Sequence, residues 1–429
     1  MSDRTSTPAY SWYVLALLLA AYTFSWMDRY VLVILIEPIK EDLHLSDTVV
    51  GLIGGFAFAL IYSVAGIPIA RWADHGNRRS LIAVGVAVWS AMTFCGGLAR
   101  TAGQLLVARI GVALGESACS PTAHSLISDY FPPTRRATAL SIYQLGITTG
   151  IALGLAVGGW ANARYGWRHA FMIVGFPGLL LALLIRKTVR EPIRGQSDNA
   201  VDTAALSLRD TLRVMVSRKS FLAYAVALGL CSFADTAFEM WSPAYLMRVY
   251  HLSSSLVGSR TGLLEAIAGL GGTLLGGLMA DKLGTRDPRW YLWMPVLSVL
   301  ALIPSVFLFL TAGLQTVFVF YFVAMFLAGS YMGPVVGLTQ RLMPVRMRAL
   351  AASIQFLILN LLGPGAGVSF VGIMSDALAH RYGVLSLRYA LISSLGVAGL
   401  GIALFLYAAH WLRRDFALVE TVAAQPAHA

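Results

Sequence analysis

Charged residues are scarce in this chain of 429 amino acids. They make up 12% of it, whereas a soluble globular protein usually carries about 25%. Hydrophobic residues account for 57% and the mean hydropathy is +0.71, so there are too few polar side chains to cover a water-facing surface. The short alternating segments of an outer-membrane barrel are also missing. The composition therefore predicts an all-α polytopic membrane protein.

Motifs for catalysis and for ATP hydrolysis are absent as well. The chain contains no G-x-x-x-x-G-K-[ST], no H-E-x-x-H and no G-x-S-x-G. Its three cysteines, Cys95, Cys119 and Cys231, lie in apolar stretches, which argues against a disulfide framework and against a zinc site. We expect them to be small buried side chains. The sequence thus predicts neither an enzyme nor a resident cofactor.

Twelve apolar stretches are long enough to cross a bilayer. Gly, Pro and basic residues separate them. The predicted spans are residues 11–37, 47–71, 80–99, 103–130, 137–163, 167–187, 219–247, 255–280, 290–311, 314–340, 349–376 and 386–412.

The longest polar segment divides these spans into two sets of six. It predicts an N-terminal six-helix bundle (1–187), a cytoplasmic linker (188–218) and a C-terminal six-helix bundle with a short cytoplasmic tail (219–429). Within the linker, Leu208 and Leu212 recur at helical spacing with basic residues on another face. An amphipathic helix on the membrane surface would have this pattern, and a solvated linker fits it equally well.

Lys and Arg are unevenly divided between the segments that connect the spans. With a cytoplasmic amino terminus, 22 of the 32 fall in cytoplasmic segments and eight on the opposite side. The positive-inside rule therefore predicts that both termini face the cytoplasm, with the protein in the cell (inner) membrane. Because topology explains most of the net charge of +11, membrane lipids are expected partners and nucleic acid is not.

The two halves of the chain repeat each other in parallel. The stretch HLSDTVVG (44–51) matches HLSSSLVG (251–258) at an offset of 207, and Asp28 matches Asp235 at the same offset. Two six-helix bundles related by a pseudo-two-fold axis are the architecture of one class of transporters, whose substrate site lies near mid-membrane between the repeats.

The loops after spans two and eight identify a family. They read ARWADHGNRRS (70–80) and GLMADKLGTRD (277–287), and both resemble the signature G-x-x-x-D-[RK]-x-G-R-[RK] of the major facilitator superfamily. The second copy keeps most of the signature, while the first has Ala70, His75 and Asn77 in place of the usual residues. The resemblance implies the major facilitator fold for the whole chain.

Within the superfamily, the chain resembles the spinster branch of lipid exporters. The resemblance rests on the charged pair in span one, on the Asn in the first loop signature and on the stretch RIGVALGESACSPTAHSLISDYFPP (109–133). That stretch departs from the branch's R-x-x-x-G-x-G-E-A pattern at Ala113 and at Ser117. The branch implies an amphiphilic anionic lipid as substrate.

Charged residues inside predicted spans mark the candidate site, because a charge at the bilayer centre costs about 2.5–3.5 kcal/mol on insertion scales. Asp28 and Arg29 lie ~12–14 Å from the outer end of span one, at a rise of 1.5 Å per residue. Glu116 lies ~18 Å from the outer end of span four by the same measure. These three residues therefore reach similar depths, and we expect Arg29 to pair with Glu116. Arg109 lies two turns before Glu116 on the same face of span four. The family resemblance implies a role for it in proton coupling, and a packing role near the outer end fits equally well.

This group suits competition between a proton and an anionic substrate. Protonation of Glu116 or Asp28 would free Arg29, whose planar fork can hold a phosphate. The alternative is a static ion pair that only fixes helix packing. In the second half, Asp235, Glu239 and Trp241 are candidate cavity-wall residues, although an aromatic stripe also serves helix packing.

The loop signatures predict a gate at the inner ends of the spans. By analogy with the family, Asp74 would meet the stretch near Arg348, and Asp281 would meet the stretch near Arg136. A carboxylate at a helix amino terminus is favoured by the free amides and the dipole there. Anchoring by positive charge alone is the other interpretation. The predicted gating residues are Asp74, Arg78, Arg79, Arg136, Asp281, Arg286 and Arg348.

These observations predict a secondary active transporter that works by alternating access and is driven by a proton gradient. The spinster resemblance implies a sphingoid phosphate or a lysophospholipid as substrate, and another small organic anion or a hydrophobic drug is the alternative. We expect the protein to act as a monomer. A channel would differ from it by flux that neither saturates nor responds to a pH gradient.

Overall fold

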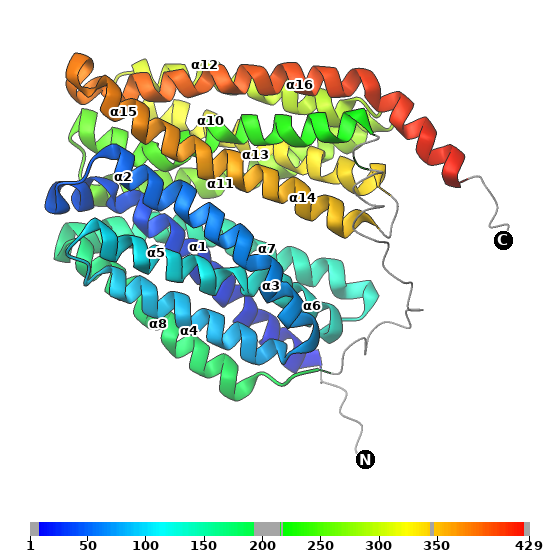
Figure 1. Ribbon diagram of the computed structural model, residues 1–429, viewed down its shortest axis with the longest axis horizontal. Coiled ribbons are helices and arrows are strands. Elements are labelled where there is room, and N and C mark those ends of the chain that lie inside the picture. Colours follow the sequence, from blue (N-terminus) through cyan, green and yellow to red (C-terminus); the bar gives the residue numbers. More distant parts are fainter. Residues whose placement is uncertain (1–7, 193–214, 216–217, 344–346, 424–429) are drawn as a thin grey trace. The chain divides into compact units, whose positions relative to one another are not determined.

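The computed structural model describes residues 8–192, 215, 218–343 and 347–423, and within these ranges it contains helices and no strand (Figure 1). Helices are the expected solution for apolar sequence in a bilayer, because every backbone N–H and C=O group then finds a partner within its own segment. The amphipathic helix predicted around Leu208 and Leu212 lies outside the described residues.

The helical segments of the first half follow the predicted spans closely. They are α1 (Pro8–Leu43), α2 (Asp47–Gly51), the π-helical η1 (Leu52–Phe56), α3 (Ala57–His75), α4 (Arg78–Gly96), α5 (Ala102–Ser117), α6 (Cys119–Tyr130), α7 (Pro133–Tyr165) and α8 (Trp167–Thr188). Span two consists of α2, η1 and α3, and span four consists of α5 and α6.

The described part of the second half is also helical, but its interrupted span is span eleven. Its segments are α10 (Lys219–Tyr250), α11 (Ser254–Gly284), α12 (Trp290–Thr311), α13 (Val317–Leu342), α14 (Arg348–Asn360), the π-helical η3 (Leu361–Gly367), α15 (Val368–Tyr382), the short η4 (Gly383–Leu385) and α16 (Ser386–Ala423). Every one of the twelve predicted spans therefore falls on one helix or on consecutive helical segments. Ten stretches of the described chain meet the length and hydropathy of a membrane span, and the last of them, Leu350–Phe416, holds spans eleven and twelve.

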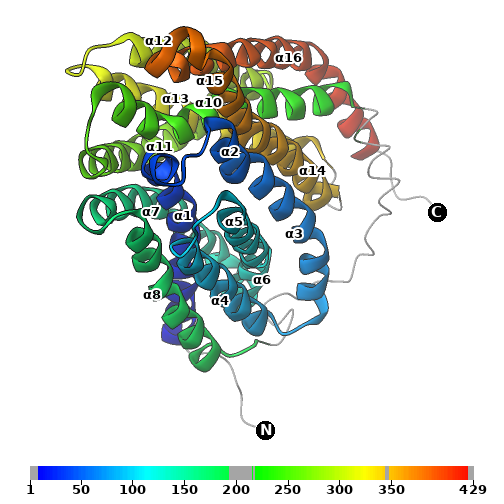
Figure 2. The same cartoon turned by 60° about the vertical axis from the view of Figure 1, so that its left-hand side comes forward.

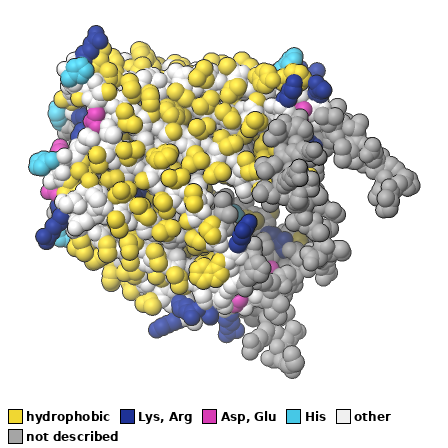
Figure 3. Space-filling model, viewed as in Figure 1, with side chains coloured by type: hydrophobic (Ala, Val, Ile, Leu, Met, Phe, Trp, Pro, Cys, Tyr) yellow, Lys and Arg dark blue, Asp and Glu magenta, His cyan; other side chains and the backbone are white. Residues whose placement is uncertain are grey.

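The surface of the helices is apolar along their middle. Figure 3 shows hydrophobic side chains over this part of the visible face and Lys, Arg and His side chains gathered near the helix ends. On α11, for example, Leu274 and Leu278 are 64% and 66% exposed, which suits contact with lipid. Of the three cysteines, Cys119 and Cys231 are buried as predicted. The prediction is wrong for Cys95, which is exposed because it lies on an outward face of α4.

The chain forms two compact units. Unit 1 contains Met1–Val201 and Pro243–Ala266, and unit 2 contains Asp202–Ser242 and Ile267–Ala429. The last turns of α10 and the first part of α11 therefore belong to unit 1, although they come from the second half of the sequence. Within unit 1, α4 packs between α5 and α8 (Figure 2).

Glycines on α7 bring it close to α1 in unit 1. Gly146, Gly150, Gly154 and Gly158 recur at every fourth position of α7, face α1 and are all buried. A Cβ atom at Gly150 would lie 2.4 Å from the Thr23 carbonyl oxygen, so a larger residue would force the helices apart. This close approach fixes the half of α1 that carries the two charges.

Candidate functional site

The predicted pairing of Arg29 with Glu116 is present in unit 1. Arg29 Nε donates to Glu116 Oε2 over 2.6 Å, and this bond joins α1 to α5. The Glu116 side chain is 0% exposed, whereas 20% of the Arg29 side chain remains accessible. Arg29 is therefore the member of the pair that a ligand can reach.

Three aromatic rings surround the same guanidinium group. The Arg29 Cζ atom lies 4.8 Å from the ring centroid of Trp26, 5.1 Å from that of Phe58 and 4.8 Å from that of Tyr62. We refer to these three residues as the aromatic cage. Rings at such distances attract a cation by about 0.5–2 kcal/mol each. The cage therefore stabilises the charge of Arg29 independently of Glu116.

Asp28 turns towards a different set of partners, as neighbouring residues on a helix must. Its Oδ2 atom accepts a hydrogen bond of 2.9 Å from the Thr93 hydroxyl on α4, and the residue is 1% exposed. Its Oδ1 atom has no hydrogen-bond partner among the described residues. A buried carboxyl with one free oxygen retains the capacity to take a proton or a hydrogen bond from a ligand.

Arg109 completes the group, but it does not form a direct ion pair with Glu116. Its Nη1 atom donates to the backbone carbonyl of Asp28 over 3.2 Å, and its Cζ atom lies 5.0 Å from the Phe58 ring. Phe58 thus contacts both arginines. We call Asp28, Arg29, Arg109 and Glu116 the polar cluster. Its two acids and two bases balance formally, which lowers the cost of holding four ionisable groups inside the bundle.

The candidate cavity-wall residues of unit 2 are in different surroundings. Asp235 is half-buried and accepts hydrogen bonds from the hydroxyls of Tyr331 and Thr236. Glu239, one turn further along α10, is also half-buried. Trp241 is 0% exposed and donates its indole N–H to the Val368 carbonyl over 3.0 Å. Trp241 therefore packs α10 against α15, which is the second role that its sequence pattern allowed.

The predicted gating residues of unit 1 form contacts within that unit. Arg78, 2% exposed, donates to Asp129 on α6 over 2.5 Å and to Glu191 over 2.8 Å. Glu191 also accepts from the backbone N–H of Arg79 over 2.9 Å. Asn77, which replaces a Gly of the signature, caps α4 by accepting from the Ser80 N–H. Arg78 thus joins three segments at one end of the bundle.

The remaining gating residues have the following partners. Arg136 donates to the Ser128 carbonyl over 2.8 Å. In unit 2, the exposed Asp281 accepts from the Tyr291 hydroxyl and pairs with Arg341 at 3.3 Å. Arg348 donates to the Met343 carbonyl, and Arg286 is exposed. The side chain of Asp74 lies outside the described part of the structure. The pairing of Asp74 with Arg348, and of Asp281 with Arg136, stays a prediction.

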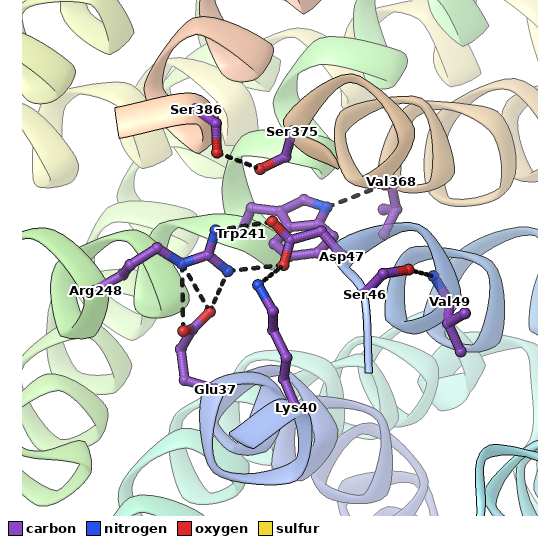
Figure 4. Close-up of polar contacts among 10 residues, drawn as sticks. All are labelled: Glu37, Lys40, Ser46, Asp47, Val49, Trp241, Arg248, Val368, Ser375 and Ser386. Atoms are coloured by element: carbon purple, nitrogen blue, oxygen red, sulfur yellow. Dashed lines mark hydrogen bonds and ion pairs between the residues drawn. The ribbon is translucent and has the colours of Figure 1, made fainter. Parts of the chain in front are cut away.

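Unit 1 contains a second cluster of charged residues, which the sequence analysis did not predict. Figure 4 shows Arg248, near the end of α10, between Glu37 of α1 and Asp47 of α2. Its guanidinium donates to Glu37 over 2.5 Å and to both oxygens of Asp47 over 2.8 Å, and Lys40 donates to Asp47 over 2.6 Å. We call these four residues the Arg248 cluster. The sequence offered one indication of this cluster: Arg248 and Lys40 are basic residues near the predicted outer side, where the positive-inside rule expects few.

Close backbone contacts accompany the Arg248 cluster. The Ser254 hydroxyl donates to the Gly159 carbonyl over 3.1 Å, and Asn162 donates to Ser254 over 2.9 Å. A Cβ atom at Gly258 would lie 2.1 Å from the Leu155 carbonyl oxygen. These contacts hold the start of α11 on α7 and explain why Pro243–Ala266 forms part of unit 1.

Comparison with known proteins assigns the family. Residues 18–368 match the model of the Major Facilitator Superfamily. An MFS-type efflux pump of Mycolicibacterium smegmatis is 35% identical over 90% of this chain and 89% of its own length. The sphingosine-1-phosphate transporter SPNS2 of Danio rerio is 27% identical over 91% of this chain and 82% of its own length.

A solved structure is similar to this chain in both sequence and fold. It is the crystal structure of a bacterial homologue of the human lysosomal transporter spinster, in an inward-facing and unoccupied conformation. That protein is 30% identical to this chain, with a TM-score of 0.89 over 96% of this chain and 99% of its own. The chain is thus a multi-pass membrane transporter rather than an enzyme, and it belongs to the Major Facilitator Superfamily, in its spinster branch.

Proposed function

We propose that this secondary transporter couples movement of an amphiphilic anion to movement of a proton, and that the polar cluster performs the coupling. The observation that carries the proposal is the ion pair between Arg29 and Glu116 inside the aromatic cage. An arginine keeps its charge at any physiological pH, whereas a buried carboxyl can become neutral by taking a proton. The pair can therefore be broken by one proton without moving a helix.

Protonation of Glu116 and binding of an anion to Arg29 are then linked. When Glu116 is ionised, its Oε2 atom accepts the hydrogen bond from Arg29 Nε and its charge offsets that of the guanidinium. When Glu116 takes a proton, the attraction is lost, and the aromatic cage keeps Arg29 in place with free N–H donors. An anionic head group can then take the position of the carboxylate. Asp28, with its free Oδ1 atom, is the second carboxyl that can take part.

The substrate class rests on the chemistry of this site and on relatives. A guanidinium fork matches a phosphate head group, and a membrane-embedded transporter can receive an apolar chain from the lipid. A sphingoid phosphate or a lysophospholipid has both parts, and one spinster relative is a sphingosine-1-phosphate transporter. A hydrophobic drug or another small organic anion is the second candidate, since another relative is an efflux pump.

The remaining parts of the proposal concern topology and gating. Both termini would face the cytoplasm of the cell membrane, and the bundles 1–187 and 219–429 would move as two bodies in a functional monomer. The carboxyl-terminal ends of α1 and α10 then lie on the outer side. There the Arg248 cluster would hold the transporter closed to the outside, and Asp74 and Asp281 would hold it closed at the inner side.

Transport by the purified protein in proteoliposomes tests this function. We expect a pH gradient to drive saturable flux of a fluorescent sphingoid phosphate, and Glu116→Gln to abolish the driven flux in a folded protein. Arg29→Ala should weaken uptake of anionic substrates more than uptake of a neutral analogue. Asp42→Asn is the matched control, because Asp42 forms only an exposed pair with Arg168. Driven flux at the wild-type rate in Glu116→Gln would remove Glu116 from the mechanism.

A further inference from the structure

Unit 2 carries a half-buried acid inside a membrane span that the polar cluster does not use. Asp235 lies on α10 at the position that corresponds to Asp28 in the sequence repeat. The residue after Asp28 is an arginine, whereas the residue after Asp235 is Thr236. Asp235 therefore occupies the pseudo-symmetric position without the neighbouring cation, and its function must differ from that of Asp28.

Hydroxyl groups contact both oxygens of this carboxyl. The Tyr331 hydroxyl on α13 donates to Asp235 Oδ2, and the Thr236 hydroxyl donates to Oδ1 over 3.2 Å. Tyr331 is 1% exposed, while Asp235 itself is half-buried and thus accessible to protons. The other titratable groups that act on Asp235 are Glu239 and Cys231, both on α10. Neither hydrogen bond comes from a cation.

This environment favours the neutral form of the acid. Even partial burial disfavours a carboxylate without a paired cation, and two neutral hydroxyls offset only part of that cost. Glu239, on the same helix, adds a further acidic group rather than a positive charge. Partial burial and the absence of a cationic partner among the described residues thus both favour the protonated, neutral form of Asp235.

The hydroxyls around Asp235 can accommodate both protonation states. Thr236 Oγ1 lies 3.0 Å from Ser232 Oγ, and either oxygen can be the donor. When Asp235 is ionised, Thr236 donates to Oδ1. When a proton from water binds Oδ1, this O–H donates to Thr236, whose own hydroxyl proton turns to Ser232. No hydrogen bond is lost, and the charge of Asp235 changes from −1 to 0.

The neighbouring backbone fixes this chain of hydroxyls. A Cβ atom at Gly363 in η3 would lie 2.5 Å from Ser232 Oγ, so the absence of a side chain there leaves room for this hydroxyl beside the π-helical segment. Such π-helical segments are frequent at functional sites. Tyr331 holds the opposite oxygen of Asp235 from α13. Three separate segments therefore converge on one carboxyl that lies inside a membrane span.

We propose that Asp235 is a second proton-binding site, in which Tyr331 holds one oxygen and the Thr236–Ser232 pair adapts to the proton on the other. The inference rests on the proposed proton coupling, to which it adds a second proton per cycle. It predicts that Asp235 and Glu116 bind protons independently, because their hydrogen-bond partners are different residues in different units.

Infrared spectroscopy of the purified protein tests proton binding without any need for transport. We expect the C=O stretch of a protonated carboxyl to disappear in Asp235→Asn and to remain in Glu116→Gln. The same band should weaken as the pH is raised and should shift in Tyr331→Phe, which keeps the ring. A carboxyl of Asp235 that is ionised over the whole pH range, or protonated over the whole range, overturns the proposal.

Transport stoichiometry gives the second measurement. In proteoliposomes, the pH gradient that just balances a substrate gradient reports the number of protons per substrate. We expect Asp235→Asn and Tyr331→Phe to lower this ratio by one in a protein that still transports, with Thr236→Val as a weaker variant. An unchanged ratio in Asp235→Asn overturns the second site alone. Wild-type flux that ignores the pH gradient instead refutes the proposed function, and the infrared result still decides whether Asp235 binds a proton.

Discussion

The ion pair between Arg29 and Glu116 predicts how substrate binding responds to pH. The perturbation is Glu116→Gln, which removes the negative charge and keeps the size and hydrogen-bonding capacity of the side chain. In the wild type, the ionised carboxylate of Glu116 competes with an anion for the charge of Arg29, and protonation of Glu116 removes this competition. The substitution makes this step unnecessary, so anion binding should become tighter and insensitive to pH.

The size of the effect follows from the geometry. Opposite charges about 4 Å apart attract by about 4 kcal/mol at an effective dielectric constant of ~20. Arg29 is 20% exposed, so water screens part of this attraction. We therefore expect Glu116→Gln to tighten anion binding by about tenfold to a hundredfold at pH 7.5, since each factor of ten corresponds to about 1.4 kcal/mol. For the wild type, uptake of one proton gives at most about a tenfold change in affinity per pH unit.

Isothermal titration calorimetry in lipid nanodiscs provides the assay. The ligand is decyl sulfonate, whose charge does not change with pH, and decyl glucoside is the neutral counterpart with the same chain. Wild-type affinity for the sulfonate should rise from pH 7.5 to 5.5 and approach that of Glu116→Gln, which should stay constant. Neutral binding should not depend on pH in either protein. Asp42→Asn controls for the loss of a carboxyl elsewhere.

Two results would refute this reasoning. If wild-type affinity for the sulfonate does not change between pH 7.5 and 5.5, protonation does not free Arg29. If Glu116→Gln retains the wild-type pH dependence, another group accepts the coupling proton. Equal pH dependence for the sulfonate and the glucoside would indicate a change in the protein that is unrelated to anion recognition.

Three further predictions follow from other contacts. Arg248→Gln removes the ion pairs of Arg248 with Glu37 and Asp47, so thermal unfolding should show a loss of about 3–5 kcal/mol in the free energy of unfolding, whereas Arg168→Gln, which breaks an exposed pair, should cost less than about 1 kcal/mol; equal losses would contradict the greater stabilisation expected from the Arg248 cluster. Gly150→Ala should lower stability by about 1–3 kcal/mol because its Cβ would lie 2.4 Å from a carbonyl oxygen, while Gly66→Ala, with nothing within 4 Å, should not. Between α11 and α12, burial alone would raise the pKa of Asp287, but hydrogen bonds from Arg289 and Arg413 lower it from 3.8 to about 2. Its stabilisation should therefore be complete above about pH 4 and disappear as the pH falls towards about 2; a stability difference between wild type and Asp287→Asn that is the same at both ends of this range would contradict it.

The sequence by itself determined which segments cross the membrane. Apolar runs of sufficient length form helices in lipid whatever their neighbours are, because the backbone has no other partners there. For the same reason, depth along a helix can be counted from its end, and this count places Arg29 and Glu116 at similar depths. The glycines at every fourth position of span five likewise predicted close approach to another helix, although they did not identify α1 as the partner.

Tertiary structure decided which side chains meet. Phe58 and Tyr62 belong to the aromatic cage only because α3 packs beside α5 with these two rings near Arg29 of α1, and the sequence contains too many aromatic residues for these two to be recognised. Arg248 finds Glu37 and Asp47 because α10 ends beside α1 and α2, more than 200 positions away in the chain. Trp241 resembled a cavity residue by its type and span, yet the packing of α15 buries it completely. Helix formation depends on local composition, whereas these contacts depend on how distant helix faces are oriented, and no local pattern encodes that.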